Sequence, residues 1–102
     1  MNLIYADFMK VDFKGRLVLS CRGTHDDLER QGITLRDGLS FVFYNDDEDN
    51  QGNPDDLVVK GIVEYDRENE RWTARIEFDA IKNTSSLSAE EKLDLGISAP
   101  QL

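Results

Sequence analysis

The sequence of 102 residues has little cysteine, histidine or proline and no long apolar run. Its one cysteine, Cys21, excludes an intramolecular disulfide, and a small domain without disulfides fits a reducing compartment such as the cytoplasm. No apolar run approaches the roughly 20 residues that a membrane-spanning helix needs. The first ten residues carry Asp7 and lack a basic leader, so they do not resemble a signal peptide. We therefore expect a soluble, cytoplasmic protein.

The scarcity of cysteine and histidine also leaves few catalytic arrangements. A nucleophile would have to be Cys21, or a serine, acting with His25. Cys21 is in phase with Leu17 and Leu19, which predicts that it faces the core as a small hydrophobic residue. One cysteine and one histidine do not make a zinc site, and the glycines do not cluster into a phosphate-binding loop. We therefore expect no catalytic residue, metal or cofactor, with a small hydrolase using Cys21 and His25 as an alternative.

Positive charge is also in short supply. The formal net charge is −9, from 21 acidic and 12 basic residues. Affinity for nucleic acids and anionic membranes depends largely on lysine and arginine, so neither is an expected partner. Segment 1–23 has a small positive balance, but segment 45–56 has six acidic residues and no basic residue. Most of the negative excess therefore lies in one segment.

The acidic segment 45–56 is the clearest feature with chemical content. Calcium binds six to eight oxygen ligands, so this segment could form a calcium site from Asp46, Asp47, Asp49, Asp55 and Asp56. An EF-hand register starting at Asp47 places Val58 where the bidentate glutamate belongs, so the segment is not an EF-hand. A solvated loop, and a loop that attracts a basic partner, are the other interpretations.

Period-two alternation of apolar residues dominates the rest of the chain and predicts strands. It is clearest in segment 71–79 and in segment 57–66, which a short polar turn joins into a hairpin. Gly61 within the second of these predicts a bulge or a close backbone approach. A further strand follows Gly38, and a first hairpin is expected to turn near Lys14 and Gly15, with segment 3–8 extending its first strand.

Two short helices are expected. Thr24 could cap a turn that ends at Gly32, and Ser88 with Glu91 fits a capping box before a stop at Gly96. These elements favour a mostly β protein with a five-stranded, antiparallel, partly open barrel over residues 1–96, SH3-like first and OB-like second, and a loose tail over 97–102. The strands around Gly38, Gly61 and Trp72 resemble those of SH3-like modules. The expected core, anchored by Trp72, includes Val11, Phe13, Leu17, Leu19, Phe41, Phe43, Val63, Ile76 and Phe78.

The strand phases also place apolar residues on the face opposite the core. If Phe41 and Phe43 point inward, Val42 and Tyr44 point outward, and Val18, Val58 and Ile62 do so by the same phase. Such residues either form a patch that binds a partner or a second copy, or lie under a second core layer. We expect a non-enzymatic protein-interaction module. Its contact residues would be Val42, Tyr44 and Ile62, beside the acidic carboxylates of Asp46, Asp47, Asp49, Asp55 and Asp56, and its partner an unknown, possibly basic, protein or a second copy.

Overall fold

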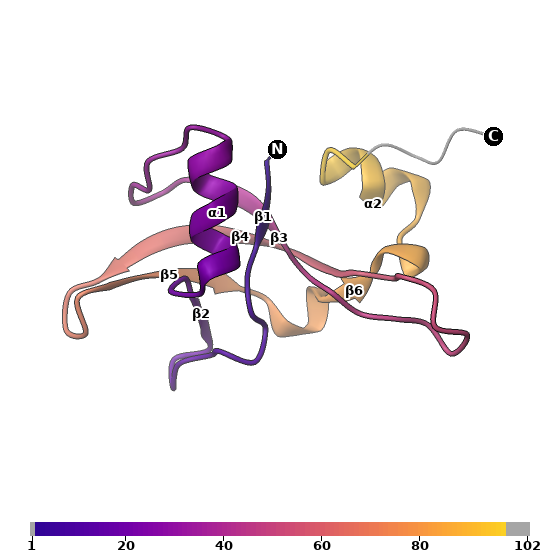
Figure 1. Ribbon diagram of the computed structural model, residues 1–102, viewed down its shortest axis with the longest axis horizontal. Helices are drawn as coiled ribbons and strands as arrows, with labels where there is room; N and C mark the ends of the chain where they lie inside the picture. The colour runs from indigo at the N-terminus through magenta and orange to yellow at the C-terminus, as the bar shows by residue number, and fades with distance from the viewer. Residues whose placement is uncertain (1, 98–102) are drawn as a thin grey trace.

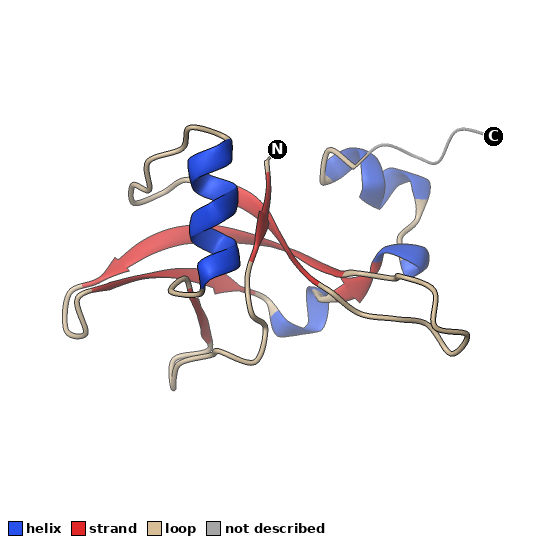
Figure 2. Ribbon diagram, viewed as in Figure 1, coloured by secondary structure: helices blue, strands red, loops and turns tan. Residues whose placement is uncertain are grey.

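The computed structural model describes residues 2–97, which form a six-stranded mixed sheet with short helices around it (Figures 1 and 2). The main path of the sheet runs in the order β1-β3-β4-β5-β2, and β6 pairs antiparallel with β4 beyond the end of β5. The strands are β1 (Leu3–Tyr5), β2 (Arg16–Val18), β3 (Ser40–Asn45), β4 (Leu57–Asp66), β5 (Arg71–Ile76) and β6 (Lys82–Asn83). The helices are α1 (Arg22–Arg30), α2 (Ala89–Asp94) and the 3₁₀ turns η1 (Phe78–Ala80) and η2 (Thr84–Ser86).

The mostly β class is confirmed, but the five-stranded, wholly antiparallel arrangement is wrong. Strand β1 pairs in parallel with β3, with Ile4 opposite Phe43, instead of extending the first hairpin. Among the described residues the sheet stays open, with β1 and β2 at the two ends of its main path. A barrel of SH3-like or OB-like topology therefore stays a prediction.

The hairpin of β4 and β5 confirms the strongest sequence pattern. Its register places Val63 opposite Ala74 and Tyr65 opposite Trp72, and the chain turns between Asp66 and Arg71. Gly61 marks a close approach and not a bulge, because the pairing continues through it without an extra residue. A Cβ atom at this position would lie 2.8 Å from the Phe43 ring.

The first hairpin also forms, but two expected core residues, one in its turn and one after β5, are outside the core. The chain turns at Lys14 and Gly15, and the backbone N–H of Val18 donates to the carbonyl of Lys10 at 2.9 Å. Phe13 lies in this turn and is 85% exposed. Phe78 is 49% exposed because β5 ends at Ile76 and the chain enters η1. Period-two phase does not apply outside a strand, which is why both assignments are wrong.

The main core lies between one face of the sheet and α1. Leu28 of α1 packs with Ile4 of β1 and with the inward residues of the central strands. Helix α1 begins after Cys21, which is its N-cap and is half-buried, so Cys21 is not the core residue that its phase predicted. Thr24 is likewise not a cap: it lies within the helix, and its hydroxyl donates to the carbonyl of Tyr5 at 2.6 Å.

The C-terminal helix follows its predicted local signals. Ser88 and Glu91 form the reciprocal capping box, and Gly96 has the positive φ of 70° that suits a residue just beyond a helix end. The tail expected from Ile97 lies outside the described residues except for Ile97, whose N–H donates to the carbonyl of Lys92. None of the helices in the described part is long and apolar enough to cross a membrane.

Candidate functional site

The predicted contact residues Val42, Tyr44 and Ile62 differ in how far the structure buries them. Val42 is completely buried, and Val18 and Val58 are also buried. Thr84 and Ile97 from the C-terminal segment line one cavity with Val58 and Tyr44. The assignment of Val42 as a contact residue is therefore wrong, since it has no surface to offer. Only Ile62 is exposed, at 38%.

Tyr44 has a structural role that accounts for its polar group. Its hydroxyl donates to the Asp27 carboxylate at 3.0 Å, and the same carboxylate accepts the backbone N–H of Tyr5 at 2.8 Å and pairs with Arg30. Burial, followed by the hydrogen bond to Asp27, raises the pKa of Tyr44 to about 12. Burial alone would raise the pKa of Asp27, but the hydrogen bonds from Tyr5 and Tyr44 outweigh it and lower the pKa. This network joins α1 to β1 and β3.

The acidic segment forms an extended loop between β3 and β4 (Figure 1). The carboxylates of Asp47, Asp49 and Asp55 accept hydrogen bonds from other residues of the chain. Asn83 of β6 donates to Asp47 at 2.8 Å, and the hydroxyl of Ser85 donates to Asp55 at 2.6 Å. Asp49 accepts the backbone N–H groups of Gln51 and Asn53 and so closes the tip of the loop.

Two further acidic residues, Asp46 and Asp56, lie at the base of the loop. They line one shallow cavity, and burial together with the charge of Asp46 raises the pKa of Asp56. Within residues 2–97 no group of three or more His, Cys, Asp or Glu side chains is arranged to hold a metal ion. The calcium alternative stays a prediction.

Cys21 and His25 are close in sequence, but the Cys21 side chain contacts Thr24 and the His25 side chain is exposed. The Sγ atom of Cys21 lies 3.0 Å from Oγ1 of Thr24, and His25 is exposed on α1. Their recorded contact is a backbone hydrogen bond of 3.3 Å from the N–H of His25 to the carbonyl of Cys21. The hydrolase alternative stays a prediction.

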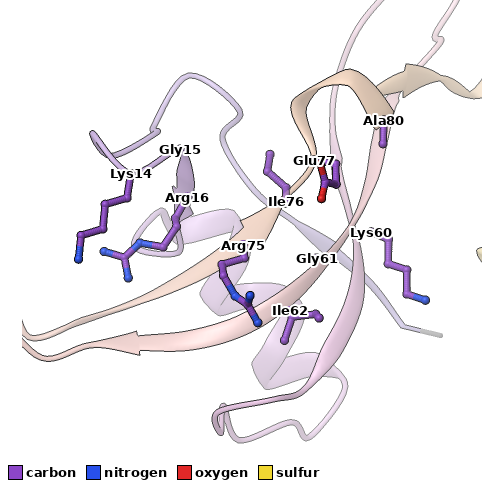
Figure 3. Close-up of a pocket in the computed structure, with 10 residues that line it drawn as sticks. All are labelled: Lys14, Gly15, Arg16, Lys60, Gly61, Ile62, Arg75, Ile76, Glu77 and Ala80. Carbon is purple, nitrogen blue, oxygen red and sulfur yellow. The ribbon is translucent and has the colours of Figure 1, made fainter.

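A groove on the sheet face that α1 leaves open is the feature that sequence reasoning missed (Figure 3). We call it the cationic groove. Ile62 of β4 and Arg75 of β5 are register partners and lie side by side in it, while Lys14 and Lys60 lie toward its two ends. Its volume of about 540 Å³ is in the range of ligand-binding sites. The lining residues are Lys14, Gly15, Arg16, Lys60, Gly61, Ile62, Arg75, Ile76, Glu77 and Ala80.

The two arginines of the cationic groove are held by carboxylates of the sheet. Arg16 is buried and binds Asp12 at 2.8 Å and Glu64 at 3.2 Å, and Arg75 binds the second oxygen of Glu64 at 3.0 Å. Burial opposes the charge on Arg16, but the hydrogen bond that Arg16 donates to Asp12 and the nearby carboxylate charges outweigh burial and raise the pKa of Arg16. The hydrogen bonds from Arg16 in turn lower the pKa of Asp12 against the effect of burial. Both groups therefore stay charged at neutral pH.

The two lysines of the groove differ from the arginines. Lys14 and Lys60 are exposed, and neither forms an ion pair with another residue in the range 2–97. Glu77 is the single carboxylate among the lining residues. Glu64, Asp12 and Asp66 together offset Arg16, Arg75 and Arg71, which shares Asp66. Lys14 and Lys60 then stand against Glu77, so the groove keeps a small positive balance.

Two exposed aromatic side chains lie next to the cationic groove. The ring of Phe13 is 5.9 Å from Nζ of Lys14, measured to the ring centroid. The ring of Phe78 lies against Gly15, where a Cβ atom would be 3.2 Å from it. The groove thus combines positive charge with apolar contact area from Ile62, Phe13 and Phe78. The sequence signal for it was weak: the small positive balance of segment 1–23 and the outward phase of Ile62.

Comparison with known proteins gives no family for this chain. No family model matches the sequence, and neither the curated proteins nor the solved structures gave a match.

Proposed function

We propose that this protein is a non-enzymatic protein-interaction module and that the cationic groove, with Phe13 and Phe78 beside it, is its contact surface. The observation that carries the proposal is the position of Ile62. It lies in the middle of a central strand, is 38% exposed, and lines the groove together with Lys60 and Arg75.

The composition of this surface is that of a protein contact. Interfaces are enriched in aromatic residues and arginine at their centre, where apolar area is removed from water. Phe13 is 85% exposed and Phe78 49% exposed in the free chain, so both have area left to bury. A small ligand would fill the groove, but it would not cover the two phenylalanine rings outside it.

The proposal keeps the class of function that the sequence indicated and moves the contact surface. Of the residues predicted for contact, Val42 is buried and Tyr44 is bound to Asp27, so Ile62 is the apolar member that remains available. The acidic loop is not part of the proposed surface, because Asp47, Asp49 and Asp55 already accept hydrogen bonds from this chain.

The test is quantitative capture from an extract of the cells that make this protein, with the tagged wild type and two matched variants. Ile62→Glu places a charge in the cationic groove, and Leu93→Glu places the same charge at a residue of α2 that is 80% exposed. We expect the wild type and Leu93→Glu to capture equal amounts of a specific partner. Ile62→Glu should capture at least tenfold less of it. Equal capture by both variants, with both folded by circular dichroism, contradicts the proposal.

A further inference from the structure

We infer that the segment bound in the cationic groove is an acidic stretch of a partner protein that also carries apolar side chains. This inference rests on the proposed function and adds the chemistry of the partner. The inferred partner segment is negatively charged, whereas the acidic loop suggested a positively charged partner. The reason is that the apolar surface and the acidic loop are at different places in the fold, and the apolar surface is the cationic one.

Lys14 and Lys60 carry the positive charge of the groove that no carboxylate binds in the described part of the chain. Both ammonium groups are exposed and without a carboxylate partner in the described part of the chain, although the protein has nearly twice as many acidic as basic residues. Each can therefore gain an ion pair on binding without first losing one. Arg75 adds a third cation, which is 62% exposed and shares Glu64 with Arg16.

The net charge of −9 does not prevent this contact. Charges farther apart than the Debye length of about 8 Å are largely screened at physiological ionic strength. Asp56, at the base of the acidic loop, immediately precedes β4 and is four residues before Lys60, which corresponds to about 13 Å of extended chain. The molecule is 46 Å long, and the loop extends from one end of it (Figure 1). An acidic segment in the groove would therefore experience chiefly the charges of the groove itself, where Lys14 and Lys60 outnumber Glu77.

The same features favour an acidic protein segment over other anions. Nucleic-acid binding usually neutralises about six to ten phosphates, and two unpaired lysines are too few for that. A small anion would use the lysines but leave Ile62, Phe13 and Phe78 exposed. A segment that alternates acidic and apolar residues could pair with the lysines and cover all three apolar side chains.

The experiment is calorimetric titration of the whole protein with four probes. The first is a synthetic peptide that alternates aspartate and leucine. The second has lysine in place of aspartate, the third has serine in place of leucine, and the fourth is citrate. We expect saturable binding of the aspartate–leucine peptide alone. Tighter binding of the lysine–leucine peptide, or equal binding of citrate or the serine peptide, overturns the inference.

Two charge-reversal variants locate the site. Lys60→Glu alters the cationic groove, and Arg67→Glu makes the same change of charge in the exposed turn between β4 and β5. We expect Lys60→Glu to lower the affinity for the aspartate–leucine peptide by about five- to tenfold, because one exposed ion pair is lost and a repulsion is added. Arg67→Glu should lower this affinity by less than about twofold. Equal effects of the two variants overturn the inference.

The outcomes also separate this inference from the proposed function. If Ile62→Glu abolishes capture of a partner but the acidic peptide does not bind, the groove is a contact surface for another chemistry. If the wild type associates with itself and Lys60→Glu prevents it, as sedimentation would show, the occupant is a second copy of this chain and a separate acidic partner is excluded.

Discussion

Arg16 and Arg75 are register partners on β2 and β5, so two guanidinium groups lie on the same side of the sheet on neighbouring strands. Like charges placed directly opposite each other destabilise an antiparallel pair. Glu64 reduces this cost because its two oxygens bind the two arginines at 3.2 and 3.0 Å. Two positive charges therefore lie next to each other on the face of the sheet opposite α1, and Glu64 binds both of them. The proposed contact surface is built on this relationship.

The bridging role of Glu64 predicts opposite effects on stability and binding. In Glu64→Gln the two arginines lose their shared carboxylate, so the free energy of unfolding should fall by about 1 kcal/mol. Arg75 would then be free to pair with a ligand, so the aspartate–leucine peptide should bind more tightly. Urea unfolding and calorimetry measure the two effects. Glu68→Gln, in the exposed turn after β4, is the control, and an equal loss of stability in both variants would show that Glu64 has no bridging role.

The burial pattern predicts unequal costs for two apolar truncations on the same face of the sheet. Val42→Ala should lower the free energy of unfolding by about 2 kcal/mol, because it leaves a cavity at a completely buried position. Ile62→Ala should cost less than about 1 kcal/mol, since the side chain is already partly in water. Urea unfolding of both variants checks this. Equal or reversed costs would contradict the complete burial of Val42.

The close approach at Gly61 predicts a coupled pair. In Gly61→Ala the new methyl group would lie 2.8 Å from the Phe43 ring and 3.0 Å from Ile76, so the variant should lose about 1 to 3 kcal/mol. Phe43→Leu removes the ring, and in that background the added cost of Gly61→Ala should be much smaller. A double-mutant cycle by urea unfolding gives the coupling free energy. Additive costs would contradict the contact.

The lowered pKa of Asp27 predicts how stability depends on acid. The pKa of Asp27 is lower in the folded state than the unfolded value of about 3.9. The charged carboxylate therefore stabilises the fold above about pH 3.9, and this contribution is lost as the pH falls through the folded pKa. Asp27→Asn should cost about 2 kcal/mol at neutral pH and flatten the loss of stability below about pH 4. Unfolding midpoints over a pH series test this. Asp26→Asn, whose carboxylate is 61% exposed, should change neither quantity appreciably.

The pKa of Tyr44 tests the same network from the alkaline side. A folded pKa of about 12 means that Tyr44 contributes stability below the unfolded value of about 10 and loses it as the pH rises through about 12. Asp27→Asn should lower this pKa because it removes the charge and the acceptor, while burial keeps part of the shift. The difference in tyrosinate absorbance between each protein and its Tyr44→Phe version isolates this residue. An unchanged pKa would mean that burial alone accounts for it.

Local signals in the sequence were enough for the elements that depend on near neighbours. The β4–β5 hairpin was predictable because its alternation is strong and its turn is short, and α2 because Ser88 and Glu91 interact within one turn. The parallel pairing of β1 with β3 was not, because it joins segments nearly 40 residues apart and leaves no periodic mark.

The same limit applies to the candidate site. Alternation assigned Val42 and Ile62 to one face correctly, but it does not say which part of that face a later segment covers. The cationic groove depends on the N-terminal turn, β4, β5 and η1 coming together. Lys14 and Lys60 therefore looked like ordinary surface residues in the sequence, and the acidic loop, whose residues are contiguous, attracted the interpretation instead.

The most direct test of the contact surface is photo-crosslinking from single positions of the full-length protein. A photoreactive residue would replace Ile62 in the cationic groove, Asp49 at the tip of the acidic loop, or Arg67 in the β4–β5 turn, and each protein would be irradiated in an extract of its own cells. We predict a discrete protein adduct from position 62 and none from positions 49 and 67. An adduct from position 49 without one from position 62 would make the acidic loop the contact surface and contradict the account.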